Sequence, residues 1–148
     1  MLGVSCRGTD FIRLRPKGHP RQPDVKVVID KVKKLMLENN YDYIYITTEE
    51  KQIIEMFYEV FSKEKTLVME REYYDKVFYA NSEIQYVTEV TFQRDNDLHM
   101  REWEYLASVV MLSECNALCG GNCGATRLAL IMNDLRYEFV HIFNEGLY

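Results

Sequence analysis

The sequence predicts an α/β fold with three layers, in which helices cover both faces of a parallel, Rossmann-like sheet. Short apolar runs typical of strands alternate with longer segments whose apolar residues recur at helical spacing. This alternation is the pattern of βαβ units, whose strands run parallel. The length of 148 residues fits one domain with a single core, and neither an internal repeat nor a linker divides it.

The first half of the chain begins with a short apolar run that ends before Gly8, the pattern of a buried strand. Three prolines and Gly18 then predict a loop. Thr48, followed by two glutamates, has the form of a helix start, because threonine can cap a first turn and acidic residues favour it. We therefore expect strands at 2–6, 41–47 and 66–69, a loop at 11–23, and helices at about 25–38 and 49–61.

The second half of the chain is harder to assign. Residues 70–96 are aromatic and charged without a sustained period, which predicts irregular structure with a short helix and a β-prone piece at 85–92. Asp97 has the residue type and the place of an N-cap. We then expect a helix at 98–114, a strand at 116–119, a turn at 120–122, a helix at 125–132 and a strand at 137–143.

Composition excludes some classes of function. A net charge of −5 argues against a nucleic-acid-binding protein with a broad basic face. The chain has no apolar run of membrane-spanning length and no signal-peptide pattern, so we expect no membrane span and a cytoplasmic location. The cysteines at 6, 115, 119 and 123 fit no common zinc spacing. Reduced structural thiols are the favoured interpretation, with metal or redox chemistry as the alternative.

In parallel α/β sheets, ligands bind at the carboxyl ends of the strands, which directs attention to three segments. The first follows the first strand and contains Arg7, Gly8, Thr9 and Asp10. The planar guanidinium of Arg7 suits phosphate, and Gly8 permits close approach of the backbone. Thr9 adds a hydroxyl, and Asp10 could orient Arg7 or bind a ribose. The alternative is an Arg–Asp ion pair that closes a turn.

The second segment joins a strand to a helix and consists of Gly120, Gly121, Asn122, Cys123, Gly124, Ala125 and Thr126. Free N–H groups at a helix N-terminus bind anions with the help of the helix dipole, and small residues leave space for a diphosphate. The segment lacks the Lys-Ser/Thr pair of a Walker A loop. A plain connecting turn is the alternative, and no base stands near Cys123 in the sequence to make it a catalytic thiol.

The third segment is Thr47-Thr48-Glu49-Glu50, at the end of the second strand, with Thr48 and Glu49 as its candidate site residues. A carboxylate there could bind a ribose hydroxyl or a base amino group, and a helix cap is the alternative. His19 lies in the stiff loop that follows the first segment, where it could close over phosphates or simply be solvated. Asp95 and Asp97 have the Asp-x-Asp form of metal-dependent sugar transferases, but an N-cap explains Asp97 better, so we expect no metal.

Together these segments resemble a known family. Gly3–Asp10 is similar to the first donor-binding motif, Gly-Val-His-x-Arg-Arg-x-Asp, of the fucosyltransferase-like superfamily that includes the α-1,2, α-1,6 and O-fucosyltransferases. Tyr45–Glu49 resembles its second segment, a strand that ends in Thr/Ser-Asp/Glu. Residues 112–126 resemble the third, a Leu-Ser-x-Cys helix end before a strand and a small-residue turn. Ser5 and Gly8 replace the motif's His and second Arg, as in a version similar to bacterial polysaccharide-synthesis relatives.

The resemblance implies that residues 1–148 are the carboxyl-terminal, donor-binding domain of a GT-B glycosyltransferase that binds a GDP-sugar, with fucose as one candidate sugar. It implies that Arg7 stabilises the leaving diphosphate, that backbone N–H groups of residues 120–126 and Thr126 bind it, and that Glu49 contacts the nucleoside. We expect the acceptor-binding amino-terminal domain to be absent, so transfer to a glycan would need that partner domain. The alternatives are a nucleotide- or phosphate-binding module without transferase activity and a cysteine-based metal or redox protein.

Overall fold

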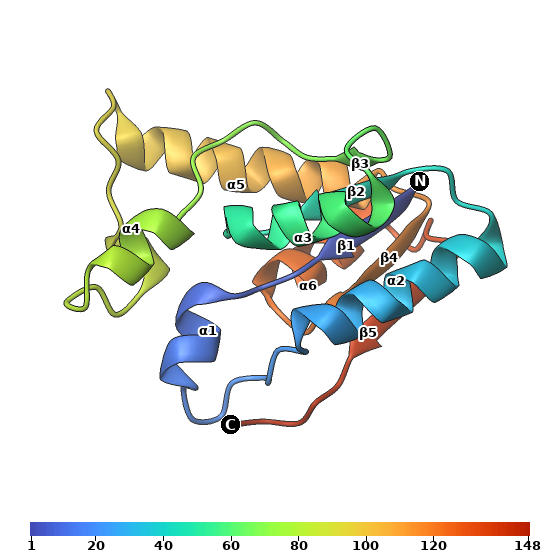
Figure 1. Ribbon diagram of the computed structural model, residues 1–148, viewed down its shortest axis with the longest axis horizontal. Helices are drawn as coiled ribbons and strands as arrows, with labels where there is room; N and C mark the ends of the chain where they lie inside the picture. The colour runs from blue at the N-terminus through green and yellow to red at the C-terminus, as the bar shows by residue number, and fades with distance from the viewer.

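The computed structural model describes all 148 residues and confirms the three-layer α/β prediction (Figure 1). Its strands are β1 (Leu2–Ser5), β2 (Ile44–Thr47), β3 (Thr66–Leu67), β4 (Ala117–Gly121) and β5 (Phe139–Phe143). Its α-helices are α1 (Thr9–Leu14), α2 (Val25–Asn39), α3 (Lys51–Phe61), α4 (Asp75–Ala80), α5 (Asp97–Ser113) and α6 (Gly124–Asn133), and a 3-10 turn, η1, covers Val87–Glu89. The five strands form one sheet in the order β3-β2-β1-β4-β5, and every neighbouring pair is parallel.

The sheet is buried on both faces, which explains why its central strands are continuous apolar runs. Side chains of β1, β2 and β4 that point to one face form the main core with α2 and α3. On the other face, Tyr45 and Leu118 pack against α5 and α6. Gly3 also points to that face, where an added Cβ would lie 2.8 Å from Leu112 Cδ1, so glycine lets α5 approach β1 closely.

The strand order places a topological switch between β1 and β4. The chain passes from β1 outward to β2 and β3, and then returns to the other side of β1 to form β4 and β5. Ligands of open α/β sheets bind at such a switch, outside the carboxyl ends of the strands. Arg7 follows the end of β1, and Cys123 follows the end of β4, so both lie at this edge.

Two predicted boundaries near the switch are wrong. The loop expected from residue 11 begins later, because Thr9–Leu14 forms α1 and the prolines that interrupt regular structure come after it. The turn expected at 120–122 is also displaced, because Gly120 and Gly121 continue β4 in register with Ile142 and Phe143 of β5. The connection between β4 and α6 therefore contains only Asn122 and Cys123.

Two predicted helix caps are also wrong. The helix expected to begin at Thr48 begins at Lys51, and the Thr48 hydroxyl instead accepts the N–H of Glu50 in a turn (3.3 Å). At α5 the N-cap position belongs to Asn96. Asp97 is the first helical residue, and its carboxylate accepts the N–H of Phe92 (3.0 Å).

Residues 70–96 form a separate small core rather than a further strand. Figure 1 shows α4 and its flanking loops at one end of the molecule, near the N-terminal end of α5. Tyr74, Phe78, Val87 and Val90 are packed together there. The strand expected at 85–92 is wrong, because the Glu89 carboxylate accepts the N–H groups of residues 85 and 86 and closes the η1 turn.

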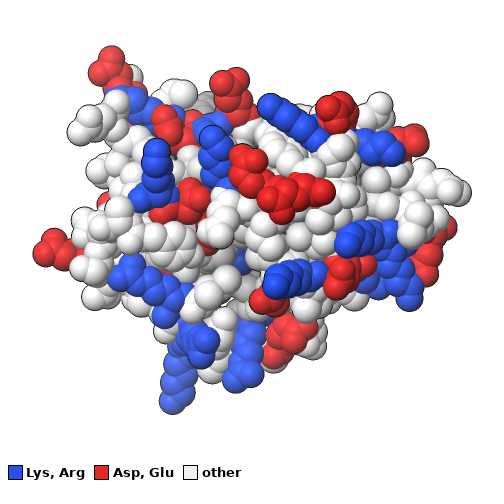
Figure 2. All heavy atoms as spheres, viewed as in Figure 1, with Lys and Arg blue, Asp and Glu red and all other residues white.

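The surface carries both signs of charge. Figure 2 shows Lys and Arg side chains interspersed with Asp and Glu over the visible face. None of the helices combines the length and the apolar character that crossing a membrane would require.

Candidate functional site

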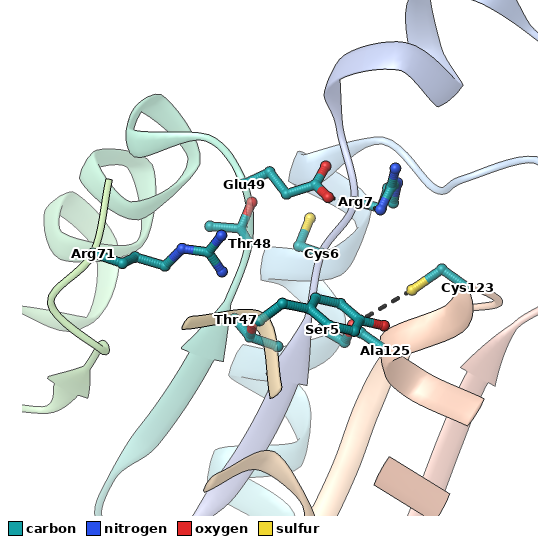
Figure 3. A pocket seen from close by; sticks show the side chains of 10 residues that line it. Ser5, Cys6, Arg7, Thr47, Thr48, Glu49, Arg71, Cys123 and Ala125 are labelled. Atoms are coloured by element: carbon teal, nitrogen blue, oxygen red, sulfur yellow. Dashed lines mark hydrogen bonds and ion pairs between the residues drawn. The ribbon is translucent and has the colours of Figure 1, made fainter. Parts of the chain in front are cut away.

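A small cavity of about 30 Å³ opens at the switch between β1 and β4 (Figure 3). The tips of β1 and β2, the start of α6, the loop after β3 and the middle of α5 all contribute to it. Its lining consists of Ser5, Cys6, Arg7, Thr47, Thr48, Glu49, Arg71, Tyr105, Cys123 and Ala125. The three segments singled out in the sequence, far apart along the chain, therefore meet at one cavity.

Arg7 is held by two carboxylates and an aromatic ring. Its Nη1 donates to Glu49 Oε1 at 2.7 Å, and its Nη2 donates to Asp10 Oδ1 at 2.9 Å. The guanidinium carbon lies 4.6 Å from the centre of the Phe11 ring. The Nε atom is buried and has no acceptor in the protein. The guanidinium is thus fixed in place and keeps an N–H group without a protein partner.

Burial shifts the pKa values of Arg7 and Glu49 in opposite directions. Burial lowers the pKa of Arg7, but the carboxylates of Glu49 and Asp10 outweigh it, so the net pKa is raised and Arg7 stays cationic. Burial raises the pKa of Glu49, and Arg7 and the Thr9 hydroxyl, which donates to Glu49 Oε2 at 2.9 Å, oppose that rise. An anion that enters beside Glu49 would favour its protonation further.

Glu50, which unlike Glu49 is buried, fixes the backbone of the Arg7 loop. Glu50 Oε1 accepts the backbone N–H of Thr9 and, at 2.9 Å, the hydroxyl of Tyr79. Thr9 takes the left-handed conformation, with φ at 47°. An added Cβ at Gly8 would lie 2.6 Å from Glu50 Cδ, so a side chain at this position would have to displace the Glu50 carboxyl group. Glu50 thereby sets the direction in which Arg7 leaves β1.

The N-terminus of α6 faces the same cavity without a side-chain cap. Cys123 occupies the N-cap position, and its side chain makes no capping hydrogen bond. Its Sγ lies 3.6 Å from Ser5 Oγ and 3.4 Å from Thr126 Oγ1 instead. The first N–H groups of a helix have no partner within it, and with the helix dipole they attract anions. Ala125, in this first turn, lines the cavity.

The other predicted residues support the cavity or lie outside it. Gly120, inside β4, packs so closely on Ser5 and Thr126 that an added Cβ would be 2.8 Å from Ser5 O. Thr126 is fully buried behind Cys123. An added Cβ at Gly124 would come no nearer than 3.5 Å to Tyr105 Oη.

Three of the predicted site residues lie outside the cavity and contact other parts of the protein. Gly121 packs against Gln22 and Pro23. The side-chain oxygen of Asn122 accepts a hydrogen bond from Arg127 Nε at 2.8 Å. His19 is exposed and packs edge-on against Phe11, with ring centres 5.6 Å apart. None of the three lines the Arg7 cavity.

A wider cavity of about 330 Å³ continues the first one under the N-terminal half of α5. Both are lined by Arg7, Glu49, Arg71 and Tyr105, so they form one cleft. Pockets for small ligands measure about 300–1,000 Å³, and the wider part falls in that range. The residues that line only this part are Tyr74, Val87, Thr88, Leu98, Arg101 and Glu102.

Sequence reasoning missed Arg71 and Tyr105 as site residues, and it gave Glu50, in the third segment, no role of its own. Arg71 lies in a segment without periodicity, so no signal in the sequence points to it. Tyr105 and Arg101 are four residues apart on α5 and so share a helix face. This spacing is a sequence signal that could have placed the two side chains together. Glu50 directly follows Glu49, and only the three-dimensional structure shows that its carboxylate turns to the Arg7 loop.

The cysteine side chains are buried, whereas reactive cysteines are partly exposed to solvent. All four cysteines are free and buried. Burial raises the pKa of Cys6, Cys115 and Cys119 to about 12, which disfavours the thiolate needed for redox or metal chemistry. No group of three or more His, Cys, Asp or Glu side chains is arranged to hold a metal ion.

Comparison with known proteins does not place the chain in a family. No family model matches the sequence, and no curated protein matches it either. A function for the chain therefore has to be argued from the geometry of the cleft together with the resemblance of its three segments.

Proposed function

We propose that the chain is the donor-binding domain of a fucosyltransferase-like glycosyltransferase of the GT-B type, and that its ligand is a GDP-linked sugar. One observation carries the proposal: the Arg7 guanidinium and the uncapped start of α6 line the same cavity at the topological switch. A cation beside a helix N-terminus is an arrangement that favours a phosphate or diphosphate. The adjoining wider cavity offers room for further parts of such a ligand.

In the proposed reaction, negative charge builds up on the diphosphate as the bond to the sugar breaks. Fixed donors that point at that charge stabilise the transition state more than the ground state. Arg7 and the first N–H groups of α6 would act in this way, with each charge-assisted hydrogen bond contributing about 1.5–3 kcal/mol. Glu49 would orient Arg7 and contact the nucleoside. No metal is needed for this role.

The glycan acceptor is assigned to a partner domain. The only carboxylate that lines the smaller cavity is Glu49, which Arg7 and Thr9 already bind. It is therefore not free to deprotonate an acceptor hydroxyl. The cytoplasm is the proposed location, because four free thiols suit a reducing compartment.

Isothermal titration calorimetry with GDP, UDP and ADP tests the proposal. We expect GDP to bind, and Arg7→Lys to weaken binding because an ammonium cannot reproduce the planar fork of donors. Arg7→Ala should weaken it further. Arg136→Ala, which removes an exposed arginine paired with Glu114, is the matched control. Absence of binding to all three nucleotides, or equal affinity in the folded Arg7 variants, would contradict the proposal.

A nucleotide-binding module without transferase activity is the second candidate. Arg7 already binds the Glu49 carboxylate, and the smaller cavity contains no other carboxylate that could act as a base. This arrangement favours a module that binds a nucleotide without transferring sugar. This candidate predicts GDP binding but no transfer of sugar from GDP-fucose, even when an acceptor-binding domain is added in trans. Transfer of labelled sugar in that mixture would exclude it.

A further inference from the structure

Arg71 is the arginine of the cleft that has no carboxylate partner. It lies in the loop between β3 and α4, and Figure 3 shows its side chain directed toward the tip of β2. Its only side-chain hydrogen bond runs from Nε to the carbonyl of Glu72, at 3.3 Å. The guanidinium forms no ion pair and lies 5.5 Å from the centre of the Tyr74 ring. Both Nη groups therefore remain available for a ligand.

The other two arginines of the cleft already have partners. Arg7 is paired with Glu49 and Asp10. Arg101 is paired with Asp97 at 3.1 Å, and its Nη1 donates to the carbonyl of Thr88 at 3.3 Å. Arg71 is half-buried and its Nη groups have no acceptor in the protein, so an anionic ligand in the cleft can complete its hydrogen bonding.

Arg71 is the cation of the cleft that no carboxylate neutralises by direct contact. The wider cavity is lined by three arginines and two glutamates, and Asp10 and Asp97 lie behind the lining, paired with Arg7 and Arg101. A free cation at a cleft attracts anions to it. Figure 3 shows Arg7 and Arg71 on opposite sides of Glu49, so the positive charges approach the cleft from two directions.

We propose that Arg71 is a second anion-binding residue of this cleft, and that the ligand carries two linked anionic groups, as a nucleoside diphosphate does. The inference rests on the proposed function and adds the residue that binds the second anionic group of the ligand. Arg7 binds one phosphate beside the start of α6, while Arg71 binds the ligand from the β2–β3 side. A ligand with a single phosphate leaves one of these two guanidinium groups without its partner.

The test compares GDP with GMP by calorimetry on the whole chain and on Arg71→Gln and Arg71→Lys. Loss of a charge-assisted contact should raise the Kd for GDP about ten- to hundredfold in Arg71→Gln, and the Kd for GMP by less than about threefold. Arg71→Lys should lie between, because it retains the charge without the fork. Arg136→Gln is the control, and thermal unfolding should show Arg71→Gln as stable as the wild type.

Two results would overturn the inference while leaving the proposed function intact. One is a Kd for GDP that stays within about twofold in Arg71→Gln while Arg7→Lys weakens binding. The other is an equal loss for GDP and GMP, which means that Arg71 does not distinguish the second phosphate. If the wild-type chain binds neither nucleotide, the proposed function fails, and the inference about Arg71 fails with it.

Discussion

Replacing Gly8 by alanine is expected to displace the carboxyl group that fixes the Arg7 loop. A Cβ at this position would lie 2.6 Å from Glu50 Cδ, well inside van der Waals contact. The φ of Gly8 is −120°, outside the left-handed region, so the expected effect comes from lack of space. The carboxyl group must move, and it then loses the hydrogen bonds from the Thr9 N–H and the Tyr79 hydroxyl.

The size of the effect follows from those two hydrogen bonds. A hydrogen bond to a charged group contributes about 1.5–3 kcal/mol, so the loss of both costs at most about 3–6 kcal/mol. Tyr79 is 53% exposed, and water can replace its contact. We therefore expect Gly8→Ala to lower the free energy of unfolding by about 2–4 kcal/mol.

Urea unfolding followed by circular dichroism measures this change. Gly124→Ala is the matched control, because its nearest neighbour would be Tyr105 Oη at an ordinary 3.5 Å, and we expect a change within about 0.5 kcal/mol. In a Glu50→Ala background, Gly8→Ala should cost little more, since the obstructing carboxyl is gone. A loss below about 1 kcal/mol in the wild-type background, or full additivity with Glu50→Ala, would refute the reasoning.

Buried thiols and an ion-pair network give the remaining predictions. Because burial raises the pKa of Cys6, Cys115 and Cys119 to about 12, mass spectrometry should find these thiols unlabelled by iodoacetamide in the native protein and labelled in urea. Arg94 binds both Glu104 oxygens, at 2.5 and 2.9 Å, so Arg94→Met should lower the free energy of unfolding by about 1–2 kcal/mol at neutral pH. Hydrogen bonds from Arg94 lower the pKa of Glu104, so its contribution is present above its usual pKa and lost as the pH falls. The urea midpoint should therefore decline from about pH 5 to pH 3, and less steeply in Arg94→Met.

Distinct outcomes would contradict each of these predictions. Rapid native labelling at Cys6, Cys115 or Cys119 would mean that the thiol is not buried as described. Parallel pH profiles for the wild type and Arg94→Met would mean that Arg94 does not set the pKa of Glu104. Arg136→Met is the control for the second experiment, because its ion pair with Glu114 is exposed and should contribute little.

The sequence predicted the sheet well because its signal is local. Apolar runs such as the one in β1 alternate with helical spacing such as that of α2, and this alternation leaves few topologies open. The edge at which ligands bind then follows from the parallel arrangement alone. That is why the sequence alone places Arg7 and the start of α6 at the same edge of the sheet.

What the sequence did not predict depends on contacts between distant segments. Gly120 has the residue type of a turn, yet it pairs with β1 and β5 as part of a strand, at a place where Ser5 and Thr126 leave no room for a side chain. Thr48 reads as a helix cap, yet the carboxylate of Glu50 is drawn to Thr9 and the helix begins later. No sequence pattern marks Arg71, since its position in the cleft depends on how an irregular loop folds onto the rest of the protein.

In the proposed complex a diphosphate lies between Arg7 and the first turn of α6. A two-dimensional NMR titration of ¹⁵N-labelled protein with GDP follows both groups in one experiment. We predict that the backbone N–H signals of Gly124, Ala125 and Thr126 and the Arg7 Nε–H signal shift together and saturate at one Kd. Saturable shifts confined to other parts of the chain, with these four signals unmoved, would contradict the account.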